Sequence, residues 1–79
     1  MDVEIREGLT VYTADGQKLG KVKEVGEGSD GLSYIHVDTP MLRSNFWLAS
    51  TWAKEAGEDR LTLDFGKELL NTYKVPKLP

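Results

Sequence analysis

The most informative segment of the chain is Asp15-Gly16-Gln17-Lys18-Leu19-Gly20-Lys21-Val22. Its Asp-Gly pair is a strong turn signal, because glycine accepts positive φ freely and aspartate favours tight turns. Before the turn, Leu9 and Val11 alternate with polar residues, which is typical of a strand with one buried face. We therefore expect two β-strands joined at this turn, with Leu9 and Val11 pointing inward.

The second of these strands does not alternate regularly. Leu19, Val22 and Val25 are spaced by three, and a regular strand would place them on alternating faces. A helix would align them, but Gly20 and Gly26 disfavour it, since each interior glycine costs about 1 kcal/mol relative to alanine. We predict a strand that switches faces at a β-bulge, which small barrels use to curve.

Three later segments, 32–38, 45–49 and 60–65, also alternate as strands do. The residues expected to point inward from them are Ile35, Val37, Phe46, Leu48, Leu61, Leu63 and Phe65. A turn or a single helical turn is expected over 50–56. Several short strands separated by turn signals indicate a sandwich or a barrel. A small barrel is favoured because closure removes exposed strand edges.

The end of the chain has a different composition. Residues 67–73 are good helix formers, with Leu69 and Tyr73 one helical turn apart. Pro76 ends this helix, because proline moves the residue before it out of helical geometry. The tail that follows is interpreted either as frayed or as a short docking segment.

Length and composition predict one small domain over 1–79, with a core over 8–73 and terminal extensions over 1–7 and 74–79. The formal net charge of −3 lacks the positive field on which non-specific nucleic-acid binding depends. The chain has no cysteine, which excludes disulfide scaffolds and Cys-ligated metals. The charged N-terminal residues do not form a signal peptide, and no apolar run is long enough to span a bilayer. We expect a cytoplasmic protein without membrane insertion.

Four stretches together resemble the PRC-barrel family. They are Gly8-Leu9-Thr10-Val11-Tyr12, Asp15 to Val22, Tyr34-Ile35-His36-Val37 and Arg60-Leu61-Thr62-Leu63. The resemblance covers about Gly8 to Leu70, and its relatives include the H subunit of photosynthetic reaction centres, the ribosome-maturation protein RimM and many small stand-alone bacterial proteins. The resemblance implies a β-barrel and a protein-contacting role, and it implies no catalytic residue and no cofactor. The fold expected is mainly β: a small PRC-like barrel of about five or six strands with a short C-terminal helix.

Two patterns that carry chemistry in other proteins have little support here. Residues 26–31 match G-x-G-x-x-G, but a dinucleotide site needs a helix after this loop, and a strand follows instead. His36 and Asp38 share one strand face, yet a metal needs at least a third ligand and a catalytic histidine needs a positioned nucleophile. A metal-binding or catalytic domain around His36 is therefore kept only as an alternative.

The aromatic residues are the stronger functional signal. Trp47 lies on the strand face opposite Phe46 and Leu48, and Tyr34 lies opposite Ile35. If the aliphatic residues are core, Tyr34 and Trp47 are outside, and Trp52 can join them in a partner-binding surface, because Trp and Tyr are enriched in binding hot spots. The other interpretation is that Trp47 and Trp52 close the end of the barrel or pack under the C-terminal helix.

Taken together, these features predict a non-enzymatic protein-interaction or self-assembly module, with Tyr34, Trp47 and Trp52 as its candidate surface. Its expected partner is another protein or a second copy of itself, as a homodimer, and no small-molecule substrate is implied. The alternative is a nucleic-acid or ribosome-associated protein. It would use the basic residues Lys18, Lys21, Lys23 and Arg43, with Tyr34 or Trp47 for stacking.

Overall fold

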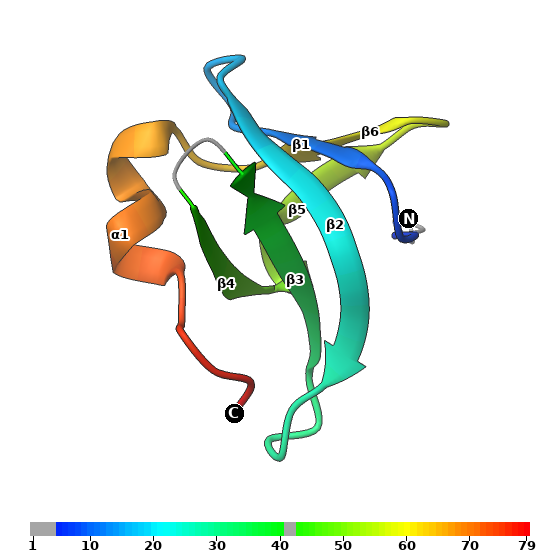
Figure 1. Ribbon diagram of the computed structural model, residues 1–79, viewed down its shortest axis with the longest axis vertical. Coiled ribbons are helices and arrows are strands. Elements are labelled where there is room, and N and C mark those ends of the chain that lie inside the picture. The colour runs from blue at the N-terminus through cyan, green and yellow to red at the C-terminus, as the bar shows by residue number, and fades with distance from the viewer. Residues whose placement is uncertain (1–4, 41–42) are drawn as a thin grey trace.

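The computed structural model describes residues 5–40 and 43–79. Within these ranges six strands form one sheet in the order β4-β3-β2-β1-β6-β5 (Figure 1). The elements in chain order are β1 (Thr10–Tyr12), β2 (Lys18–Glu27), β3 (Ser33–Thr39), β4 (Ser44–Ala49), the 3-10 helix η2 (Ser50–Trp52), β5 (Ala53–Ala56), β6 (Arg60–Leu63), the 3-10 helix η3 (Lys67–Leu69) and the α-helix α1 (Leu70–Tyr73). Neighbouring strands are antiparallel except β1 and β6, which are parallel. The predicted fold class, mainly β with a short C-terminal helix, is confirmed.

The predicted turn between β1 and β2 is present. Gly16 has a φ of 86°, a conformation that glycine adopts without steric cost. The buried Thr13 organises the turn: its hydroxyl donates to Asp15, and it accepts a hydrogen bond from the Gln17 amide at 3.1 Å. The hydrogen bond from Thr13 lowers the pKa of Asp15. Asp15 therefore stabilises the turn through its hydrogen bond with Thr13.

The predicted bulge in β2 is also present. The register with β3 shifts between Val22 and Glu24, and the register with β1 shifts next to Tyr12. As a result Leu19 and Val22 are both buried. Val25 differs from the prediction and is 43% exposed, because β2 and β3 continue as a hairpin that projects beyond the other strands (Figure 1).

Gly20 lies where β2 packs tightly against the main chain of β3. A Cβ on this residue would lie 1.9 Å from the carbonyl oxygen of Asp38. No side chain fits at that distance, so the curvature of the sheet depends on glycine here.

The concave side of the sheet holds the core. Every residue predicted to point inward from β3, β4, β6 and the segment after it is buried, and the core cluster comprises Leu9, Val11, Leu19, Val22, Ile35, Val37, Phe46, Leu48, Leu61, Leu63, Phe65 and Leu70. Trp52 and Tyr73 pack against this cluster and are partly buried. The short C-terminal helix thus covers the core with one buried residue of its own, Leu70.

Two predicted elements are corrected. The segment 50–56, predicted as a turn or a single helical turn, begins with the 3-10 turn η2 but continues as strand β5, which pairs with β6 in the register Ala53 to Leu63 and Ala56 to Leu61. Its alanine, lysine and glutamate residues have weak strand propensity, so the pairing comes from tertiary contacts. The predicted helix over 67–73 begins as the 3-10 turn η3 before α1.

The tail is docked on the domain and not frayed, which agrees with the second of its two interpretations. Val75 forms an isolated antiparallel bridge with Trp47 at the outer edge of β4. The Ser29 amide donates to the main-chain oxygen of Pro79 at 2.6 Å. The tail therefore runs from the β4 edge to the β2–β3 hairpin (Figure 1). No helix in the described part of the chain is long and apolar enough to cross a membrane.

Candidate interaction surface

Tyr34 does not lie at the surface as the alternation of β3 predicted. It is only 8% exposed. The β2–β3 hairpin folds over its ring, and a Cβ on Gly28 would lie 2.8 Å from it. Its hydroxyl donates to Oδ2 of Asp30 at 2.6 Å. Tyr34 lies on the strand face opposite Ile35, as predicted, but its predicted exposure is wrong: the hairpin covers the ring, and no partner can reach most of it.

Trp52 belongs to the core side of the molecule. Its ring stacks on Tyr73 with 4.0 Å between ring centroids and meets the Phe65 ring edge-on at 5.6 Å. Phe65 and Tyr73 also contact each other, with centroids 5.1 Å apart. Trp52 therefore packs under the C-terminal helix, as the second of the two interpretations proposed. Tyr34, Trp47 and Trp52 do not form one surface patch.

Trp47 lies on the outer face of β4, as its position between the buried Phe46 and Leu48 predicted. It is half-buried, because its ring stacks in parallel on the imidazole of His36, the residue opposite it on β3, with 4.4 Å between centroids. Its main-chain N–H and C=O face away from β3 and bond to Val75 at 2.8 and 2.9 Å. Trp47 is thus the aromatic residue of the candidate surface that lies at the sheet edge.

His36 has Glu24 as its carboxylate neighbour. Its Nδ1 atom is buried without a hydrogen bond, and Oε1 of Glu24 lies 3.5 Å away. Asp38, which shares its strand face, lies opposite Lys21 and Asn45 in the sheet. Among residues 5–40 and 43–79, no group of three or more His, Asp or Glu side chains is placed to hold a metal ion.

The C-terminal tail lies over the surface between Trp47 and the hairpin. A Cβ on Gly26 would lie 3.3 Å from the Trp47 ring and 3.4 Å from a methyl of Leu78, and a Cβ on Gly28 would lie 3.2 Å from the oxygen of Pro79. The absence of side chains at both glycines lets the tail approach the sheet. We call the residues that receive the tail, Gly26, Gly28, Ser29 and Trp47, the docking face.

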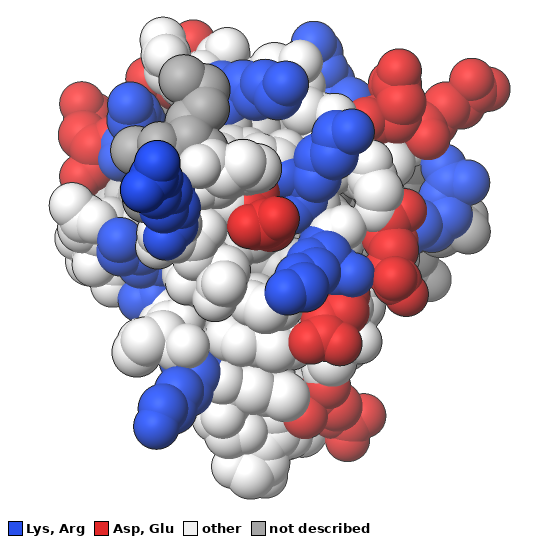
Figure 2. Space-filling view, viewed as in Figure 1, with Lys and Arg blue, Asp and Glu red and all other residues white. Residues whose placement is uncertain are grey.

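Charge is unevenly distributed on the side of the molecule that shows the hairpin and the C-terminal segment. Figure 2 shows basic and acidic side chains interleaved over the upper part of this view. A largely uncharged area runs down its centre toward the tip of the hairpin. Interleaved charges give little long-range field, so contacts on this side depend on shape and apolar area.

Comparison with known protein families matches the model of the PRC-barrel domain to residues 7–70. The chain belongs to the PRC-barrel family. Searches of curated proteins and of solved structures found no match. The tail lies outside the residues that the model of this PRC-barrel domain matches.

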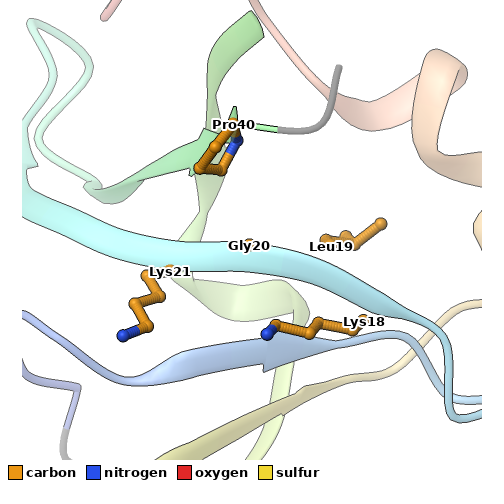
Figure 3. A pocket seen from close by; sticks show the side chains of 5 residues that line it. All are labelled: Lys18, Leu19, Gly20, Lys21 and Pro40. Carbon is orange, nitrogen blue, oxygen red and sulfur yellow. The ribbon is translucent and has the colours of Figure 1, made fainter. Parts of the chain in front are cut away.

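The basic residues of the nucleic-acid alternative fall at several places in the PRC-barrel domain. Lys18 and Lys21 line a hollow of about 190 Å³ with Leu19, Gly20 and Pro40. Figure 3 shows both lysine side chains on the β1 side of β2, with Pro40 on the opposite side. Arg43 lies in the turn between β3 and β4, where its amide donates to Pro40. Of the two predicted stacking residues, Tyr34 is closed off by Asp30.

The glycine-rich segment 26–31 is the hairpin between β2 and β3. Gly31 takes a positive φ of 83°, its amide donates to the Gly28 carbonyl oxygen, and the Gly28 amide donates to the Leu32 carbonyl oxygen. Strand β3 follows, as the sequence indicated, where a dinucleotide site would need a helix.

The amino-acid sequence alone does not reveal the docking face. Two signals for it were available: glycines at 26 and 28, and a Val-Pro-Lys-Leu-Pro tail that cannot continue a helix. Neither signal reveals that the two segments meet.

Proposed function

We propose that this PRC-barrel domain is a non-enzymatic protein-interaction module that associates with itself through the outer edge of β4. The proposal rests on the incomplete strand pairing of that edge. In an antiparallel strand, alternate residues direct their main-chain groups to the same side, so Asn45 and Ala49 face the edge as Trp47 does. The tail pairs with Trp47 alone as an isolated bridge.

An edge strand that is incompletely paired is a template for a strand of another molecule. In a homodimer with two-fold symmetry, the β4 edges of two copies face each other, and each Trp47 contributes an aromatic anchor to the interface. Trp47 is held in place by its stack on His36, so it enters an interface with little loss of side-chain entropy.

The test is the molar mass of the wild type and of Trp47→Ala by light scattering and sedimentation over a range of concentrations. We expect a reversible dimer whose dissociation constant rises at least about tenfold in Trp47→Ala, the loss typical of a hot-spot residue. The control is Leu69→Ala, which removes a side chain that is 40% exposed on η3, outside the docking face. A wild type that stays monomeric at about 1 mM, or two variants with equal dissociation constants, would contradict the proposal.

A further inference from the structure

The tail is bound to its own domain by contacts that do not depend on the covalent connection. They are two main-chain hydrogen bonds between Val75 and Trp47, one from Ser29 to Pro79, and the approach of Leu78 to Gly26. The same contacts form when the tail of another molecule lies on the docking face. A face that accepts the tail in one chain therefore accepts it from a second copy.

The tail leaves the domain through a hinge with little support. Lys74 ends α1 in an extended conformation, with ψ at 146°. Val75 precedes a proline, which disfavours helical geometry, and Pro76 has its own φ fixed. The two prolines restrict the released tail and prevent it from extending α1, which lowers the conformational entropy lost when it binds again.

Packing beside the hinge is loose. A hollow of about 300 Å³ separates the start of β4 from the segment that leads into the tail, and its lining consists of Ser44, Asn45, Phe46, Asn71, Lys74 and Pro76. Across it the Lys74 ammonium lies 5.7 Å from the centroid of the Phe46 ring. The tail is thus held mainly at Val75 and at its far end, and the hinge can change direction without opening the core.

We propose that the segment 74–79 exchanges between two copies of this chain, so that the docking face of each copy holds the tail of the other. The proposal rests on the proposed function, because it names the partner and the segment through which the domain self-associates. Exchange keeps every tail contact and joins the two copies, because each tail then pairs with Trp47 of the other copy. Binding within one chain has an effective concentration on the order of mM for a short linker, so exchange increases as the protein concentration approaches that value.

The test uses single cysteines, which are unambiguous because the chain has none. Ser29→Cys marks the docking face of one chain and leaves its amide in place, and Lys77→Cys marks the tail of a second chain that carries a fusion tag of different size. Equimolar mixtures at up to about 1 mM, near the effective concentration of the tail, are treated with a short bismaleimide. We expect a covalent product of one large and one small chain.

The control for collisions replaces Ser29→Cys with Glu58→Cys in the exposed turn between β5 and β6. We expect at least about a tenfold excess of the mixed product over this control, and loss of that excess when the tagged chain also carries Val75→Pro, which removes the N–H donated to Trp47. A chain with both Ser29→Cys and Lys77→Cys measures docking within one molecule.

An internal cross-link in that double variant, with mixed product at the control level, would overturn the exchange. If the wild type still forms a dimer in that case, the proposed function stands and only the role of the tail is lost. Absence of both cross-links would overturn the exchange as well, because the tail would then not occupy the docking face in solution.

Discussion

Gly20 is the residue on which the curvature of the sheet depends. Alanine at this position would bring its Cβ to 1.9 Å from the Asp38 carbonyl oxygen and 2.8 Å from the carbonyl carbon. Because both atoms are main chain, β2 and β3 must separate. We expect Gly20→Ala to lower the free energy of unfolding by about 3 kcal/mol or more, at the upper end of the cost of overpacking. Gly57→Ala is the matched control, since its Cβ would meet only Arg60, at 4.0 Å. Urea denaturation that gave equal losses for the two variants would contradict this account.

The hydrogen bond between Tyr34 and Asp30 links stability to pH. The Tyr34 hydroxyl and the Leu32 amide donate to the Asp30 carboxylate and lower its pKa. A lowered folded-state pKa stabilises the fold above the ordinary aspartate pKa of about 3.9, and this contribution is lost as pH falls through the folded-state value. The same bond raises the pKa of Tyr34, so it also stabilises the fold below about pH 10 and is lost as pH rises further.

We therefore expect Tyr34→Phe to raise the pKa of Asp30 and to flatten the decline of stability below about pH 4. The measurements are the carboxyl chemical shift of Asp30 against pH and urea denaturation at neutral and acidic pH. Tyr73→Phe is the control, because its ring lies with Trp52 and Phe65. An unchanged Asp30 titration in Tyr34→Phe would show that the bond does not form in solution.

At the scale of elements, the aromatic cluster fixes η3 and α1 to the core side of the sheet. These helices are too short to be stable alone, so their position depends on packing. Trp52, Phe65 and Tyr73 supply that packing from three different segments. We expect Trp52→Ala to cost about 3 kcal/mol, the lower end for a large aromatic residue because Trp52 is only partly buried.

Trp47→Ala is expected to cost clearly less than Trp52→Ala, since its ring lies on the outer face of the sheet. Urea denaturation of both variants at a concentration where the chain is monomeric makes the comparison. If Trp47→Ala lost more free energy of unfolding than Trp52→Ala, Trp47 would have the larger structural role. The basis for assigning Trp47 to an interface would then be removed.

For the molecule as a whole, the sheet has two edges that are protected differently. The edge strand β5 is short, and Arg6 donates at 3.0 Å to the carbonyl oxygen of Glu58 in the turn next to it. The edge strand β4 pairs with the tail at Trp47. The parallel pairing of β1 with β6, to which the Arg60 guanidinium over the Tyr12 ring contributes, joins the first strand to the last.

We expect a chain truncated after Lys74 to remain folded, because no residue of the core cluster lies in the tail. Its free energy of unfolding should fall by about 1–3 kcal/mol, as expected for the few main-chain hydrogen bonds removed. The Trp47 indole should become more exposed, which its NMR shift and its fluorescence in a Trp52→Phe background report. Global unfolding on truncation would contradict the division between core and tail.

The sequence was sufficient for the parts of the fold that follow local rules. The Asp15-Gly16 turn, the bulge in β2 and the inward residues of β3, β4 and β6 were all predictable from turn chemistry and alternation. Strand β5 was not, because Ala53 to Ala56 acquire their conformation from pairing with β6. The outward position of Trp47 was also predictable, whereas the burial of Tyr34 was not, since it results from the hairpin folding over the outer face of the sheet.

The amino-acid sequence by itself determined the family, the mainly β architecture and the identity of the core, because turn residues and the period of two are properties of neighbouring positions. Only the tertiary structure decided which aromatic residue remains at the surface and that the tail lies between Trp47 and Ser29. These are contacts between segments far apart in the chain. No local pattern records them, since they depend on how far β2 bends and on where α1 releases the chain.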